Sequence, residues 1–144
     1  MSQVRCEVPL MIAVDTNILA RFYVADSSDP EAAKLRPIAR RVLSESSSLF
    51  VPTTVVLELE WVLRAFYGFG RAEFARVVRH LIGLPHVHVQ DWGSIHSALE
   101  WHLKGLDFAD ALHLASSEHC TALLSFDAKR FVRKTKVRTP VSGA

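Results

Sequence analysis

Residues 11–17 read MIAVDTN, four apolar residues that end on an acid, a hydroxyl and an amide. A short, continuously apolar run is typical of a strand buried on both faces of a parallel sheet. Ligands of open α/β sheets bind outside the carboxyl ends of the strands, and Asp15 stands at such an end. This stretch therefore predicts a parallel sheet with a polar site at its edge.

Short apolar runs alternate with helical patterns along the rest of the chain. Strands are expected at residues 11–14, 49–51, 86–89 and 122–125, with a last one beginning at Val137, and helices at 18–24, 30–43, 55–67, 72–81, 91–103 and 108–119. Pro30 directly after Asp29 marks a helix start, and Pro37 is expected to kink or split that helix. The alternation predicts one α/β domain with a central parallel sheet of four or five strands flanked by helices.

The composition is that of a globular protein. The chain has 144 residues, of which 49% are hydrophobic and 22% charged, and its formal net charge is +2. This size suits one hydrophobic core, and the two cysteines support neither a disulfide framework nor a cysteine metal site. The apolar run from Val8 to Val14 is interrupted by Pro9, is too short for a bilayer and makes a poor signal peptide, so we expect a cytoplasmic protein without a membrane segment.

Basic residues gather in three groups. They are Lys34, Arg36, Arg40 and Arg41; Arg71, Arg76, Arg79 and His80; and Lys129, Arg130, Arg133, Lys134, Lys136 and Arg138. Such groups are most often solvated faces. Around an acidic site they would also suit a polyanion, because Lys and Arg contacts to phosphate supply most sequence-independent affinity for nucleic acids.

Three further acids occupy positions comparable to that of Asp15. Asp127 follows an expected strand, and Glu58 and Asp110 lie near the amino ends of helices that follow a strand or loop. Carboxylates about 4 Å apart repel by roughly 4 kcal/mol at an effective dielectric near 20, unless a cation joins them. Oxygen-only ligands favour hard ions such as Mg²⁺ or Mn²⁺. The pattern permits phosphodiester hydrolysis by a metal-activated water.

Four segments carry these acids. They are MIAVDTNIL at 11–19, ELEWVL at 58–63, DFADALHLA at 107–115 and LSFD at 124–127. In this order they resemble the PIN-domain ribonucleases and, within them, the VapC-like toxins of toxin-antitoxin pairs. The resemblance covers nearly the whole chain from Met11, itself a natural start, so residues 1–10 are expected to be an N-terminal extension of a domain at 11–144.

The resemblance also assigns roles. The family's four acidic, metal-binding positions fall on Asp15, Glu58, Asp110 and Asp127, and the supporting polar positions fall on Thr16, Asn17 and Ser125. Asp15 and Asp110 would be the direct ligands of Mg²⁺ or Mn²⁺. The implied protein is an endoribonuclease toxin that forms a homodimer, cleaves RNA and is restrained by an antitoxin protein covering the acidic crevice.

Neighbouring residues have plainer interpretations. Asp107 is expected to cap the helix that carries Asp110, and Glu60 turns to a different face from Glu58. His113 is expected to pack or to support the site rather than to bind a metal. The three tryptophans are expected to be core residues rather than platforms on which bases stack: Trp61, Trp92 and Trp101.

Two other functions remain open at this point. A catalytically silent PIN-like domain would serve as a protein- or RNA-binding module, and the absence of divalent-cation binding in a titration would favour it. An aspartyl-phosphate enzyme would use Asp15 as its nucleophile. Phosphatases of the haloacid-dehalogenase type usually carry a second Asp where this chain has Asn17, which disfavours that alternative.

Overall fold

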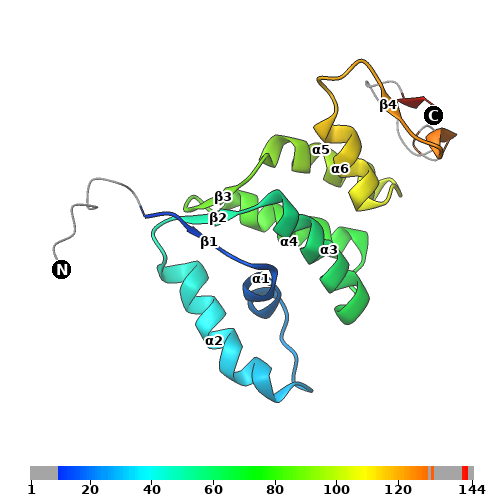
Figure 1. The fold of residues 1–144 in the computed structure, drawn as a ribbon. Coiled ribbons are helices and arrows are strands. Elements are labelled where there is room, and N and C mark those ends of the chain that lie inside the picture. The colour runs from blue at the N-terminus through cyan, green and yellow to red at the C-terminus, as the bar shows by residue number, and fades with distance from the viewer. Residues whose placement is uncertain (1–9, 130, 132–140, 143–144) are drawn as a thin grey trace. The chain divides into compact units, whose positions relative to one another are not determined.

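The computed structural model describes residues 10–129, 131 and 141–142, which form two compact units (Figure 1). The first unit comprises the described residues up to Phe69 together with Val77–Gln90. The second comprises Gly70–Arg76 and the described residues from Asp91 onward. One helix, α4 (Arg71–Gly83), contributes its beginning to the second unit and its remainder to the first.

Three parallel strands form the sheet of the first unit. They are β1 (Ile12–Ala13), β2 (Leu49–Val51) and β3 (Val87–Val89), in the order β1-β2-β3. Ile12 is in register with Leu49, and Phe50 with His88. Because the pairing is parallel, the carboxyl ends of the strands lie at one edge, and Asp15 follows β1 at that edge.

Helices α1 (Thr16–Tyr23), α2 (Pro30–Glu45) and α3 (Thr53–Tyr67) belong to the same unit, and α1 contacts both of the others. Asp29 caps α2 by accepting a hydrogen bond from Glu31 N–H. Helix α2 continues through Pro37 as one helix, so the expected split does not occur. Helix α3 ends at Gly68, whose φ of 67° favours glycine.

Aliphatic side chains fix where α1 and α3 lie. Leu19 of α1 and Leu59 and Leu63 of α3 are fully buried, as is Leu49 of β2. Burying a leucine side chain stabilises the fold by about 1.5–3 kcal/mol. This shared core holds the amino end of α1 beside the first turns of α3.

The second unit is built on α5 (Trp92–Leu103) and α6 (Phe108–Ser116), which pack on each other. Phe74, His102 and Phe108 stack edge to face with ring centroids 5.0–6.0 Å apart. The buried His102 ring hydrogen-bonds to the carbonyl oxygen of Leu106 through Nδ1, at 2.7 Å. Strands β4 (Leu123–Leu124) and β5 (Val141–Ser142) pair in parallel in this unit.

The α/β class and the parallel pairing are confirmed. In the part of the chain that the structure describes, however, the strands are divided between a three-stranded and a two-stranded sheet rather than placed in one sheet of four or five. Apolar runs identify strands but do not say which strand pairs with which. Val137 and residues 1–9 of the expected extension lie outside the described residues.

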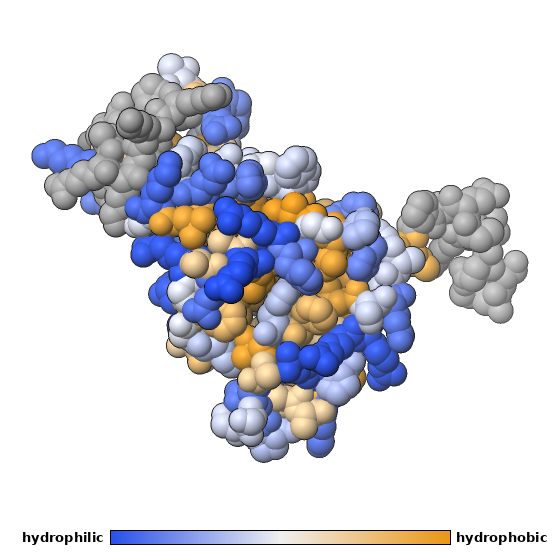
Figure 2. All heavy atoms as spheres, turned by 180° about the vertical axis from the view of Figure 1, so that it is seen from behind, coloured by the Kyte–Doolittle hydropathy of each residue, from blue (hydrophilic) through white to orange (hydrophobic). Residues whose placement is uncertain are grey.

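Two expectations about burial are wrong. Strand β1 is not buried on both faces, because both of its residues, Ile12 and Ala13, are exposed, and Ile12 is 52% exposed. Trp61 and Trp92 are 51% and 61% exposed rather than core residues. Trp61 lies two positions from both Leu59 and Leu63, which places it on the opposite side of α3 from these buried leucines. Hydrophobic side chains also lie among hydrophilic ones on the face of the molecule that Figure 2 shows. None of the described helices is long and apolar enough to cross a membrane.

Candidate functional site

Two of the predicted acids, Asp15 and Glu58, line one pocket of the first unit. The pocket has a volume of about 280 Å³, and its other lining residues are Thr16, Asn17, Ala20, Arg21, Val62 and Tyr67. Both carboxylates are exposed to solvent. Strand β1, helix α1 and helix α3 thus bring together acids that are far apart in the sequence.

Local structure explains which side chains face this pocket. Asp15 caps α1, and its Oδ1 accepts a hydrogen bond of 2.7 Å from Thr16 N–H. The pocket-lining residues Asn17, Ala20 and Arg21 follow at spacings of three and four, so they share one face of α1. Glu58 and Val62 share a face of α3 in the same way.

Thr16 connects the two acids. Its side chain is buried, with the residue 4% exposed, and its hydroxyl donates a hydrogen bond to Oε1 of Glu58. The backbone N–H of the same residue donates to Asp15. A single buried residue therefore orients both carboxylates toward one pocket.

The charges around the pocket leave these acids without a cation. Among the described residues that line it, Arg21 is the one cation, and its Nη1 donates to Oδ2 of Asp29 at 2.6 Å. This hydrogen bond holds the pKa of Asp29 below its ordinary value and raises the pKa of Arg21. Within the described part of the chain, neither Asp15 nor Glu58 forms an ion pair. The pocket is consequently negative.

The other two predicted acids belong to the second unit. Asp110 is half-buried in the first turn of α6, and its N–H donates to Oδ2 of Asp107 at 3.3 Å. Asp107 therefore caps α6, as predicted. Asp127 is exposed after β4, and its N–H donates to the hydroxyl oxygen of Ser125 at 3.0 Å. The supporting role of Ser125 stays a prediction.

The structure thus places Asp15, Glu58, Thr16 and Asn17 around one pocket and describes Asp110, Asp127 and Ser125 in the second unit. Among residues 10–129, 131 and 141–142, no group of three or more His, Cys, Asp or Glu side chains is arranged to hold a metal ion. A single site shared by all four acids stays a prediction.

Arg21 and its partner Asp29 were not foreseen. The spacing of four between Asn17 and Arg21 on an expected helix could have indicated that both face the site. Glu60 was rightly set aside, because it is 6% exposed and pairs with Arg64 at 2.8 Å. His113 is exposed rather than packed, and its expected support of the site stays a prediction.

Residues 12–137 match the family model of the PIN domain. This chain belongs to the PIN domain family. No curated protein matches the chain. PIN domains are commonly metal-dependent nucleases, and the family generally uses divalent metals. The carboxylate, hydroxyl and amide oxygens around the Asp15 pocket of this PIN domain are ligands that suit a hard divalent cation.

Proposed function

We propose that residues 11–144 form a Mg²⁺- or Mn²⁺-dependent endoribonuclease. The observation that carries this proposal is the hydrogen bonding of Thr16, whose N–H donates to Asp15 and whose hydroxyl donates to Glu58. Two carboxylates oriented toward one pocket without an ion pair among the described residues attract a divalent cation. Oxygen ligands suit Mg²⁺ or Mn²⁺ better than softer metals.

The residues would divide the work as follows. Asp15 and Glu58 hold the cation from β1 and α3, and Thr16 fixes their orientation. By their match to the family motifs, Asp110 is a direct ligand together with Asp15, and Asp127 completes the acidic set with Glu58; Asn17 and Ser125 are supporting residues. When bound, the cation neutralises the phosphodiester and activates a water for attack on phosphorus, so RNA is cleaved by hydrolysis.

We further propose that this nuclease is the toxin component of a toxin-antitoxin pair acting in the cytoplasm. The resemblance of the four acid-bearing segments to VapC-like toxins supports this assignment and implies a homodimer. The negative pocket would accept a basic side chain of the antitoxin, and that contact would exclude both metal and RNA.

The test compares two Asp→Asn variants of the full chain. Asp15→Asn removes one carboxylate from the pocket and should lower Mg²⁺- or Mn²⁺-dependent RNA cleavage about a hundredfold or more, in line with losses seen around metal sites. Asp91→Asn is the control, because Asp91 is exposed and its φ of 49° is tolerated by asparagine. Equal cleavage by the two variants would overturn the proposal.

A second experiment addresses the RNA. Ends of cellular RNA are sequenced after controlled expression of the wild type and of Asp15→Asn, and new ends should appear with the wild type alone. If the wild type cleaves no RNA and calorimetry detects no binding of Mg²⁺ or Mn²⁺, the chain is instead a silent binding module of the same fold.

A further inference from the structure

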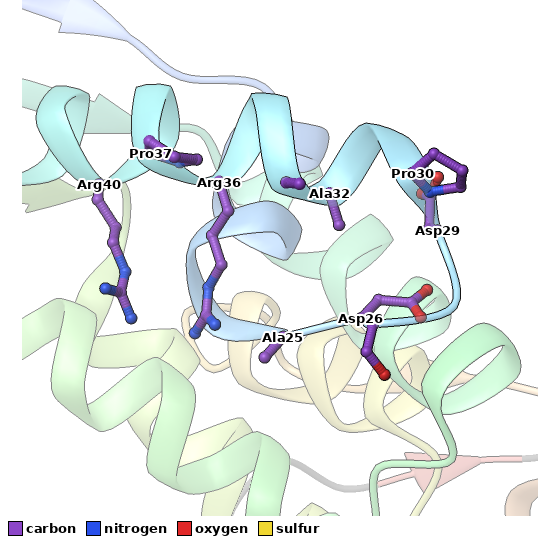
Figure 3. Close-up of a pocket in the computed structure, with 10 residues that line it drawn as sticks. Ala25, Asp26, Asp29, Pro30, Ala32, Arg36, Pro37 and Arg40 are labelled. Atoms are coloured by element: carbon purple, nitrogen blue, oxygen red, sulfur yellow. The ribbon is translucent and has the colours of Figure 1, made fainter.

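A second hollow of the first unit lies between the loop after α1 and one face of α2 (Figure 3). Its volume is about 500 Å³, within the range of roughly 300–1,000 Å³ that small-molecule sites occupy. The lining residues of α2 include Ala33, Arg36, Pro37 and Arg40, whose spacing of three and four places them on one helix face. We call this hollow the α2 cavity.

Two guanidinium groups dominate the charge of the α2 cavity. Arg36 and Arg40 lie one helical turn apart, and Figure 3 shows both side chains extending from α2 in the same direction. The Nε atom of Arg36 is buried and has no hydrogen-bond partner among the described residues. Buried donors nearly always have an acceptor, so the half-buried guanidinium of Arg36 keeps unused hydrogen-bonding capacity.

The acids of the α2 cavity cancel only part of this charge. Asp29 is paired with Arg21 at 2.6 Å. Asp26 accepts hydrogen bonds from the N–H and the hydroxyl of Ser28, at 3.0 and 2.6 Å. Neither Arg36 nor Arg40 forms an ion pair with any residue that the structure describes. Two guanidinium groups thus face one unpaired carboxylate, that of Asp26, and this excess of positive charge favours an anion.

The Arg21–Asp29 pair also connects the α2 cavity to the candidate site. Arg21 lines the pocket of Asp15 and Glu58, whereas Asp29 lines the α2 cavity. The two hollows therefore share one ion pair as part of their walls. The two hollows are therefore neighbours on the first unit.

We propose that the α2 cavity is a subsite for the RNA strand beside the cleaved bond. Arg36, with Arg40, binds a phosphate, because the planar donor fork of a guanidinium matches a phosphate oxygen pair. The apolar walls formed by Ala25, Ala32 and Pro37 receive the adjoining base. The inference rests on the proposed nuclease function only where it concerns RNA cleavage. Phosphate binding at Arg36 can be measured without cleavage.

The first test measures binding of a fluorescent single-stranded RNA oligonucleotide to the full chain in EDTA, over a series of salt concentrations. Arg36→Gln should weaken binding about tenfold and reduce the slope of log affinity against log salt by about 0.7, the value for one lost phosphate contact on a single strand. Arg41→Gln is the matched control, because Arg41 lies on α2 outside the cavity lining. Equal behaviour of the two variants overturns the proposal.

A charge-neutral variant tests the base-binding part. Ala33 is exposed and lines the α2 cavity, so Ala33→Leu fills the space without disturbing the core. Affinity should fall severalfold with an unchanged salt slope. An affinity equal to that of the wild type would show that no base enters. Circular dichroism and melting temperatures confirm that each variant is folded.

Cleavage in Mg²⁺ or Mn²⁺ then separates the two proposals. With a long RNA, Arg36→Gln should raise KM about tenfold at nearly constant kcat, and a dinucleotide too short to reach the cavity should be cleaved equally by both proteins. If the wild type cleaves nothing but Arg36→Gln still binds RNA more weakly than Arg41→Gln, the subsite stands and the nuclease assignment falls. If Arg36→Gln leaves RNA binding intact but loses an acidic protein partner that co-purifies with the wild type, the subsite is overturned while the nuclease assignment stands.

Discussion

The two hollows of the first unit share one ion pair and carry opposite charge. The acidic pocket keeps the carboxylates of Asp15 and Glu58, and the α2 cavity keeps the guanidinium groups of Arg36 and Arg40. In the Arg21–Asp29 pair, the charge of Arg21 in the acidic pocket and the charge of Asp29 in the α2 cavity neutralise each other. The sign of each hollow is thus set by the lining charges that remain unpaired.

The Arg21–Asp29 pair affects the charge of the two hollows more than it affects the stability of the fold. The side chains of Arg21 and Asp29 are 23% and 30% exposed, and ion pairs so accessible to water stabilise a fold little. Its effect on ligands is larger, because a free Arg21 would compete with a cation in the acidic pocket. A free Asp29 would likewise repel phosphate from the α2 cavity.

The largest expected effect separates two glutamates of α3. Glu58→Gln should lower metal-dependent cleavage about a hundredfold with little change in stability, because Glu58 is exposed and lines the acidic pocket. Glu60→Gln should lower the free energy of unfolding by about 1–3 kcal/mol and spare cleavage, because it weakens a buried carboxylate bonded to Arg64. Urea unfolding and cleavage rates measure both.

The two glutamates control for each other, since the substitution and the helix are the same. If Glu60→Gln lost cleavage as fully as Glu58→Gln while remaining folded, the acidic pocket would not be the centre of the chemistry.

The next effect distinguishes the two hollows by their ligands. Mn²⁺ at a hundredfold its Kd should stabilise the wild type by about 2.7 kcal/mol, because it binds the folded chain alone. Asp15→Asn should abolish this gain, and Arg36→Gln should retain it. Melting temperatures with and without Mn²⁺ give the comparison. A gain of equal size in Asp15→Asn would place the cation elsewhere.

Much of the acidic pocket could be predicted from the sequence. Asp15 follows an apolar strand, and Glu58 lies near the amino end of an expected helix. The acidic side chains and their positions therefore already indicate a polar site at the carboxyl ends of a parallel sheet. Glu60 could be set aside from helical periodicity alone, and Asp107 could be identified as a cap. These features are local, and local spacing determines them.

The remainder depends on tertiary packing. The exposure of Ile12 depends on which elements cover the faces of β1, and no single run of the sequence records that packing. The Arg21–Asp29 pair depends on how the loop after α1 returns to that helix. The α2 cavity likewise needs this loop beside Arg36. The basic group at 34–41 is therefore interpreted, from the sequence, as a solvated face that would also suit a polyanion, and the sequence does not reveal the cavity.

A smaller effect follows from breaking the shared pair at Arg21. Arg21→Gln breaks the ion pair and leaves the carboxylate of Asp29 uncompensated in the wall that the two hollows share. Affinity for Mn²⁺ should rise severalfold and affinity for RNA in EDTA should fall severalfold. Calorimetry and fluorescence anisotropy measure the two. Shifts in the same direction would contradict the idea that one pair sets the sign of both hollows.

The smallest effect is the pH dependence of stability due to Asp29. The hydrogen bond from Arg21, and then that from Glu31 N–H, hold the pKa of Asp29 below its ordinary value of 3.8. Because the folded pKa is the lower one, the charged form favours folding at every pH above 3.8. This contribution is lost as the pH falls through the lowered folded pKa.

Asp29→Asn keeps a capping side chain but loses the charge, so its melting temperature should lie slightly below that of the wild type at neutral pH. The difference should shrink as the solution is acidified below about pH 4, and a difference that stays constant over this range would show that the Arg21–Asp29 pair does not lower that pKa.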